Sequence, residues 1–309
     1  MKLKRYENGR ELRPIFRLLN IPNVLFVLLL YMASLPSVVK TKPPYAYLVV
    51  LVLIELYFVV GYLLRRRVAC HDISCILFAF FTIWAYVTKT GTAHSLLVMP
   101  MENVFYVFVT HWREMLTGLS SSLKLVAWGM ITATVLAVVL GVLIGWVTRL
   151  NQAILPIVRI ISPIPSLAYT TYVVAAMPNF RVSEIVIIFL GIFWPTFSRV
   201  ISTVATMDRK IIDSARILNV STVGMLKDIV YPYVMPTVLR NLSSSLATAF
   251  MCLTGAELVG ATSGLGYFIR KYAEYANYTN VLAGIIFMGI VVTLLSFLVS
   301  FLQKRFIKW

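Results

Sequence analysis

The sequence predicts an all-α, polytopic membrane protein with about eight transmembrane helices and both termini in the cytoplasm. Of its 309 residues, 60% are hydrophobic and only 13% are charged, whereas the surface of a soluble domain needs about a quarter charged residues. Several apolar runs reach the ~20 residues that a helix needs to cross a bilayer. These runs are too long and too uniformly apolar for barrel strands, and lipid offers no partner for open backbone groups, so helices are expected.

Eight apolar segments qualify as candidate spans. The basic N-terminus precedes a long apolar run without a small-residue cleavage site, which indicates a retained first span rather than a cleaved signal peptide. The expected spans are 15–36, 45–64, 70–89, 121–148, 162–178, 184–204, 234–257 and 281–303.

The distribution of basic residues predicts the orientation. With the N-terminus inside, 20 of the 28 Lys and Arg residues fall on the cytoplasmic side of these eight spans and 8 fall outside. This asymmetry follows the positive-inside rule. The net charge of +16 is therefore attributed to the membrane topology and to contact with lipid, and nucleic acid is not an expected partner.

Several kinds of chemistry are not supported by the sequence. It contains no G-x-x-x-x-G-K-[ST] motif, so the chain is not expected to bind ATP through a P-loop of its own. Its three cysteines indicate no disulfide framework. The cluster Cys70-His71-Asp72-Cys75 is interpreted as polar residues at a helix terminus rather than as a metal or redox site. We therefore expect no catalytic, cofactor or metal site and no enzymatic activity.

A polar segment, 207–232, interrupts the apolar chain on the expected cytoplasmic side, between spans six and seven. Asp208 is a suitable N-cap, and Asn219 tolerates the left-handed conformation that ends a helix. Ser221 could then cap a second short helix, which Pro232 and Pro236 are expected to end. The expected result is two short helices at the membrane surface.

Helical periodicity places one largely apolar stripe along this segment. Periodicity alone is equally compatible with a surface hairpin that only ties two spans together. The stripe comprises Ile211, Ala215, Leu218, Thr222, Met225 and Ile229.

The spacing within this segment resembles the cytoplasmic "EAA" loop of permease subunits of ATP-binding-cassette (ABC) importers. In that pattern, Glu-Ala-Ala is followed after three residues by Gly, and about a dozen residues later by Pro. Here Asp213 stands for the Glu, Ser214 and Ala215 stand for the two alanines, and Asn219 stands for the Gly. Pro232 stands for the proline, so the spacing is kept while three of the four leading residues are replaced conservatively.

Further stretches resemble the nitrate/sulfonate/taurine/bicarbonate branch of these permeases. AELVGATSGLGY at 256–267 is the closest, supported by SPIP at 162–165, FWP at 193–195 and MPMENV at 99–104. The resemblance covers roughly residues 75–309 and leaves the first two expected spans outside a six-span core.

The resemblance implies a division of labour with other proteins. Residues 1–68 would be an N-terminal extension with two extra spans, and 69–309 would be the permease domain with a coupling loop at 207–232. In the family, the helix matching Asp213–Leu218 docks on a separate ATPase subunit, which binds the ATP. Arg216 is the expected charged contact, unless it faces water or lipid. A homodimer in the inner (plasma) membrane and an extracytoplasmic substrate-binding protein complete the expected system.

A translocation pathway would be lined by polar residues of the core spans. Two prolines interrupt the SPIPS stretch, and broken helices can expose polar backbone to a cavity. Glu257 is expected at the outer end of the pathway, with ordinary solvation at a helix end as the alternative. The candidate pathway or gate residues are Ser162, Pro163, Pro165, Ser166, Thr254 and Glu257.

Two other functions remain open from the sequence. An ion-coupled secondary transporter would use Glu55, a carboxylate in the middle of the second expected span, but would leave the 208–232 loop unexplained. A polytopic membrane enzyme would need a convergent catalytic set that the sequence lacks. For an ABC importer, the resemblance implies a small anion such as a sulfonate, nitrate, taurine or bicarbonate.

Overall fold

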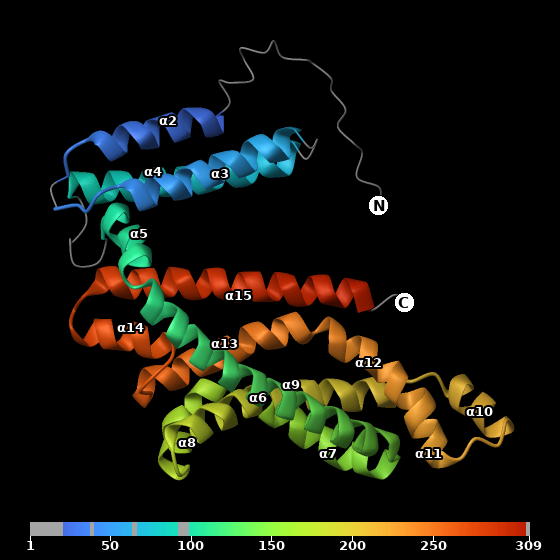
Figure 1. Ribbon diagram of the computed structural model, residues 1–309. Coiled ribbons are helices and arrows are strands. Elements are labelled where there is room, and N and C mark those ends of the chain that lie inside the picture. The colour runs from blue at the N-terminus through green and yellow to red at the C-terminus, as the bar shows by residue number, and fades with distance from the viewer. Residues whose placement is uncertain (1–20, 38–39, 64–66, 92–98, 307–309) are drawn as a thin grey trace. The chain divides into compact units, whose positions relative to one another are not determined.

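The computed structural model describes residues 21–37, 40–63, 67–91 and 99–306, and every regular element among them is a helix. The chain divides into two units. Unit 1 comprises 1–112 with 278–283, and unit 2 comprises 113–277 with 284–309. Each unit is described by itself (Figure 1).

In the described part of unit 1 the helices are α2 (Ile21–Ser34), α3 (Tyr45–Leu63), α4 (Arg67–Thr90) and α5 (Met101–Thr110), joined by the first residues of α15 (Tyr278–Phe306). Helix α4 packs against α2 and α3, and α3 also contacts α5. Lys89 and Glu102 form a buried ion pair, 3.6 Å apart, with side chains only 10% and 7% exposed. Lys89 also donates to the Leu35 carbonyl at 2.8 Å, so both charges are compensated within the apolar unit.

Unit 2 contains the remaining helices. Its core lies where α9 packs against α13 and α7. The elements are α6 (Trp112–Trp146), α7 (Thr148–Ile161), η1 (Ser166–Tyr169), α8 (Thr170–Ala176), α9 (Phe180–Ala205), α10 (Arg209–Ile217), α11 (Thr222–Gly224), the π-helical η2 (Met225–Val230), α12 (Tyr231–Arg240), α13 (Leu242–Gly260), α14 (Leu265–Glu274) and α15 (Tyr278–Phe306).

Five described segments are long and apolar enough to cross a membrane, and they match five of the expected spans. The two N-terminal spans appear as the shorter apolar helices α2 and α3, and residues 15–20 of the first expected span lie outside the described residues. The five segments are Cys70–Thr90, Trp112–Trp146, Phe180–Ala205, Leu242–Glu274 and Tyr278–Arg305.

Residues 162–178 do not form the continuous span that the apolar run suggested. Helix α7 is followed by a break, and residues 166–176 leave it at an angle of 77°. Pro163 and Pro165 lie at the break, where they interrupt the helical hydrogen bonds. The interruption expected from SPIPS is confirmed. Taken together, Thr148–Ile161 and Ser166–Ala176 are long and apolar enough for one further membrane crossing.

Close contact between α6 and α9 depends on two glycines. Gly141 and Gly145 are one turn apart on α6 and lie against Val200 and Val204 of α9. A Cβ atom on Gly141 would lie 2.6 Å from Val200 Cγ1, and one on Gly145 would lie 2.8 Å from Val204 Cβ. Small residues at such spacing let two membrane helices approach closely.

Gly141→Leu is expected to separate α6 from α9 and to destabilise the protein by about 1–3 kcal/mol, as over-packing does in dense interiors. Thermal melting of the purified protein in detergent measures this as a lower Tm. Gly289→Leu is the matched control, because nothing lies within 4 Å of a Cβ at Gly289. Equal melting of the two variants would contradict the close packing described.

Candidate functional site

The segment after α9 forms the short capped helix α10, and a second capped helix begins at Thr222. The Asp208 side chain accepts from the Lys210 amide at 2.9 Å, and the Ser221 hydroxyl accepts from the Gly224 amide at 3.2 Å. Asn219 has a φ of 53°, which is the left-handed conformation that closes many helices. The three predicted caps are therefore confirmed.

The end of α10 has the hydrogen bonds of a Schellman motif. The Val220 amide donates to the Ala215 carbonyl at 3.1 Å, and the Asn219 amide donates to the Arg216 carbonyl at 2.9 Å. Asn219 thus occupies the position where glycine is most common. Asn219 therefore forms the same helix-ending turn that the Gly of the EAA pattern would form.

The expectation that Pro232 and Pro236 end the second helix is wrong. The backbone remains helical from Thr222 to Arg240, through α11, η2 and α12. The Tyr231 amide donates to the Leu226 carbonyl, five residues back. This π-type turn lies just before Pro232, and such local adjustments let a helix accommodate a proline.

The apolar stripe is divided between two surfaces. Ala215 is only 6% exposed, and Met225 is also buried. In contrast, Ile217 is 81% exposed, Leu218 is 76% exposed and Val223 is 74% exposed. The expectation of one continuous apolar face including Leu218 is therefore wrong, because Leu218 is the C-cap residue that follows α10 and is exposed, whereas Ala215 within α10 is buried.

We call Ile217, Leu218 and Val223 the apolar tip. Figure 1 shows α10 and α11 at one end of unit 2, while α8 and α14 lie at the other end. Large apolar side chains this exposed, at the end of α10 and the start of the next helix, are typical of a surface that another protein covers.

Arg216 lies beside the apolar tip and is exposed, as expected. Its guanidinium is 3.7 Å from the Asp213 carboxylate, and both side chains are about two-thirds exposed. A pair as exposed as this contributes little to stability. Arg216 therefore remains available to a partner's carboxylate.

Helix α10 packs against the rest of unit 2 through Ile212 and faces a cavity along another side. Ile212 packs against a cluster that includes Met207 and Val234. A polar cavity of about 480 Å³ separates α10 from the ends of α6, α7 and α9, and Arg209 and Asn151 line it. The cavity leaves room for α10 to move relative to these helices.

A second site lies at the opposite end of unit 2, around Glu257. The Glu257 side chain is fully buried and accepts from the Ser122 hydroxyl at 2.7 Å and from the Gly266 amide. Ser122 in turn accepts from the Leu265 amide at 3.0 Å. The carboxylate thus joins α6, α13 and the N-terminus of α14, where negative charge is favourable.

Gly264 closes this arrangement. It has a φ of 121° and a ψ of 174°, a region essentially limited to glycine. A Cβ there would lie 2.0 Å from Glu257 Oε1. The dense glycine cluster GATSGLG therefore forms a tight turn between α13 and α14, and this turn lies against the carboxylate.

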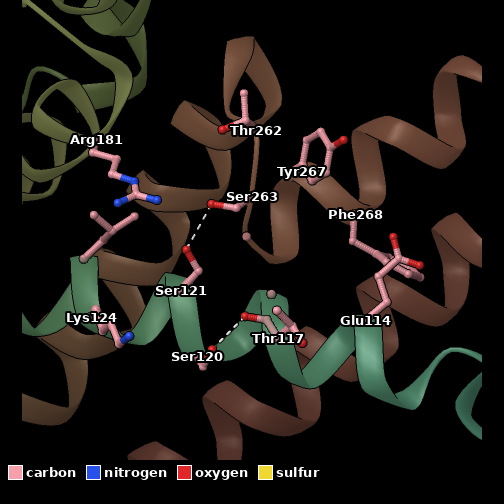
Figure 2. Close-up of a pocket in the computed structure, with 13 residues that line it drawn as sticks. Glu114, Thr117, Ser120, Ser121, Lys124, Arg181, Thr262, Ser263, Tyr267 and Phe268 are labelled. Carbon is pink, nitrogen blue, oxygen red and sulfur yellow. Dashed lines mark hydrogen bonds between the residues drawn. The ribbon is translucent and has the colours of Figure 1, made fainter.

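A cavity of about 590 Å³ opens beside this turn. Figure 2 shows Arg181 and Lys124 on one side of it, and Glu114 and Phe268 on the other. In the sequence, Lys124 and Arg181 are two of the eight basic residues expected outside the cytoplasm. No sequence pattern connects them, because they come from different helices.

The binding-protein-dependent transport system inner membrane component family matches residues 133–309, which is more than half of the chain. The chain belongs to this family. The match includes α10, the apolar tip and Glu257. It begins within α6, so α2 to α5 lie outside it.

Named relatives of this permease belong to one branch of ABC importers. The taurine transport system permease protein TauC of Escherichia coli is 26% identical over 74% of this chain and 86% of its own. SsuC of Bacillus subtilis, named as an aliphatic sulfonates transport permease, is 28% identical over 63% of this chain and 71% of its own. The nitrate import permease protein NrtB of Leptolyngbya laminosa is 27% identical over 60% and 67%. The chain is thus a multi-pass inner-membrane permease of the nitrate/sulfonate/taurine branch.

The other candidate pathway residues of the permease lie in helix packing or at the break. The Ser166 hydroxyl is 2.8 Å from Cys252 Sγ. The Thr254 hydroxyl donates to the Phe250 carbonyl at 2.7 Å and lies 3.1 Å from Met288 Sδ. Ser162, Pro163 and Pro165 lie at the α7–η1 break. None of the six, Glu257 included, is among the residues that line the two cavities described above.

The Cys70–Cys75 cluster of the permease holds one contact of interest. Cys75 Sγ lies 3.8 Å from His71 Nδ1, one turn earlier, and the same nitrogen is 3.2 Å from Asp72 Oδ1. Within the described residues, no group of three or more His, Cys, Asp or Glu side chains is arranged to hold a metal ion.

Proposed function

We propose that this permease forms the translocation pathway of an ABC importer for a small anion and is driven by a separate ATPase that grips the 208–232 loop. The observation that carries the proposal is the apolar tip, displayed on a doubly capped helix pair in a chain of this family. ATP is bound by the partner, because the chain has no P-loop motif.

The construction of the loop suits mechanical coupling. Helix α10 is closed at both ends by hydrogen bonds, so it moves as a rigid body. The helical backbone from Thr222 to Arg240 leads directly into α13. A partner that binds differently in its two nucleotide states shifts the equilibrium between two permease conformations, and this continuous helix would carry the displacement.

The proposed membrane arrangement keeps eight spans with both termini in the cytoplasm. The bias of Lys and Arg supports it, with α2 and α3 as two additional spans in residues 1–68. Exposed apolar residues along α15, such as Leu294 and Phe297, suit lipid or a second copy. The working unit would be a homodimer with two ATPase subunits and an external binding protein.

The substrate class is inferred from the relatives. Their names assign them to aliphatic sulfonates, taurine and nitrate, which are small and carry an anionic oxygen-containing group. We extend that class to this chain, with an external binding protein delivering the solute.

Reconstitution in proteoliposomes tests the proposal. The permease, the ATPase encoded beside it and the cognate binding protein should import a labelled alkanesulfonate or nitrate only when ATP is present. The control is the same system with the Walker-A lysine of the ATPase replaced. Failure of the permease to co-purify with any ATPase would contradict the proposal.

Ion-coupled secondary transport remains the second candidate because of Glu55. This residue lies on α3, and its Oε2 atom is buried without a hydrogen-bond partner among the described residues. A buried carboxylate in an apolar helix is a candidate ion or proton site. Uptake driven by a proton or sodium gradient without ATP, and lost in Glu55→Gln, would establish this function instead.

A further inference from the structure

The cavity beside the Gly264 turn is lined by cationic and hydroxyl side chains from several helices. Lys124 comes from α6 and Arg181 from the start of α9, while Thr262 and Ser263 come from the α13–α14 turn. All belong to unit 2. At about 590 Å³, the cavity has the size of a small-molecule site.

Lys124 and Arg181 are the cationic side chains that line this cavity. Within the described residues, neither forms an ion pair. The nearby carboxylate of Glu184, one turn along α9, interacts with Arg181 electrostatically but is buried. Glu114, the acid that lines the cavity, is bound by Lys271 at 2.7 Å and by the Tyr272 hydroxyl at 3.0 Å. The unpaired charge at the cavity is therefore positive.

The serine hydroxyl groups that line the cavity differ in whether their proton is free to donate to a ligand. Ser120 donates to the Thr117 carbonyl at 2.8 Å, so its proton is used. Ser121 and Ser263 lie 3.1 Å apart, and one donates to the other, which leaves one proton of the pair free. This pair and Arg181 line the same cavity (Figure 2).

We propose that this cavity is an oxyanion-binding site of the permease itself, formed by Arg181, Lys124 and the Ser121–Ser263 pair. Arg181 presents a planar fork of donors that suits oxygen-bearing anions. Lys124 adds a second charge, and the serine pair adds a hydroxyl donor. The inference rests on the proposed function and adds a selection step within the membrane protein.

The opposite wall indicates which oxyanion fits. Tyr267 and Phe268 lie there (Figure 2), Leu125 also lines the cavity, and these apolar side chains would contact a short organic group. The cavity is large for nitrate alone. We therefore assign it to an oxyanion that carries a short organic group, such as an alkanesulfonate.

The site lies far from the loop that the ATPase would grip. About 21 residues of continuous helix separate Lys124 from Gly145, which lines the cavity under α10. At 1.5 Å per residue this is roughly 30 Å, the thickness of the hydrocarbon core of a bilayer. A solute held here would stand at the end of the permease opposite α10.

Titration of the purified full-length permease in nanodiscs tests the site with ethanesulfonate, nitrate and the uncharged dimethyl sulfone. Saturable binding is expected for ethanesulfonate, weaker binding for nitrate and none for the sulfone. Arg181→Gln or Lys124→Gln should each weaken ethanesulfonate binding at least about tenfold, because each removes a charge-assisted contact. The matched control Lys304→Gln, at the exposed end of α15, should bind normally.

Cysteine protection provides a second measurement that leaves both cations in place. In Ser263→Cys, ethanesulfonate should slow modification by N-ethylmaleimide, while dimethyl sulfone should not. No saturable anion binding together with no protection would overturn the site, as would unchanged affinity in the Arg181→Gln, Lys124→Gln double variant. If uptake is driven by ATP but the purified permease binds no anion, the site is refuted and the proposed function stands. If the permease binds the anion but uptake does not depend on ATP, the proposed function is refuted and the site stands.

Discussion

Leu218→Glu is expected to abolish ATP-driven uptake and to release the ATPase from the purified complex. Leu218 belongs to the apolar tip and is 76% exposed, so the change leaves the packing of the permease intact. A central apolar anchor in an interface typically contributes about 2 kcal/mol or more, which is roughly a 30-fold loss of affinity. Co-purification of the tagged permease with the ATPase, and uptake in proteoliposomes, measure the effect.

Tyr275→Glu is the matched control for this variant. Tyr275 is 73% exposed and follows α14, at the end of unit 2 opposite α10. It should retain the ATPase. If Leu218→Glu also retains it, with normal uptake, the apolar tip is not the docking surface.

Ala215→Glu is a less informative variant than its place in the EAA-like pattern suggests. Ala215 is buried, so a glutamate would disturb the base of α10 as well as any partner contact. Arg216→Glu changes an exposed side chain instead. The sequence stripe placed Ala215 and Leu218 together, and burial separates them.

Local rules predicted the caps of the loop well. Asp208, Asn219 and Ser221 act through hydrogen bonds within three residues or through their own backbone conformation. Short-range chemistry of this kind is encoded in the sequence itself. The predicted spans that match membrane-length helices of the structure are likewise the long apolar runs of the sequence.

Features that depend on neighbouring helices were harder to predict. Pro232 looked like a helix end, but the π-type turn before it keeps the helix continuous. Lys124 and Arg181 lie 57 positions apart in sequence, and only the packing of α6 against α9 brings them to one cavity. The place of Glu257 at the pathway stays a prediction, but its burial and the hydrogen bonds that it accepts from Ser122 and Gly266 depend on neighbouring helices.

Gly264→Ala is expected to destabilise the permease by about 3 kcal/mol or more and to lower its Tm by about 5 °C or more. Two independent causes add. The backbone at φ 121° and ψ 174° strains any residue with a Cβ, and that Cβ would overlap the Glu257 carboxylate. Thermal melting in detergent measures the change, and Gly289→Ala serves as the matched control because its Cβ meets open space within a helix.

The double variant Glu257→Ala, Gly264→Ala separates the two causes. Removing the carboxylate relieves the overlap, so the double variant should be less destabilised than the sum of the two single changes. Strict additivity would show that Glu257 and Gly264 do not share one arrangement. The same turn carries Thr262 and Ser263 to the cavity wall, so Gly264→Ala should also weaken ethanesulfonate binding. Gly141→Leu changes a distant part of α6, so it should lower the Tm and leave ethanesulfonate binding unchanged.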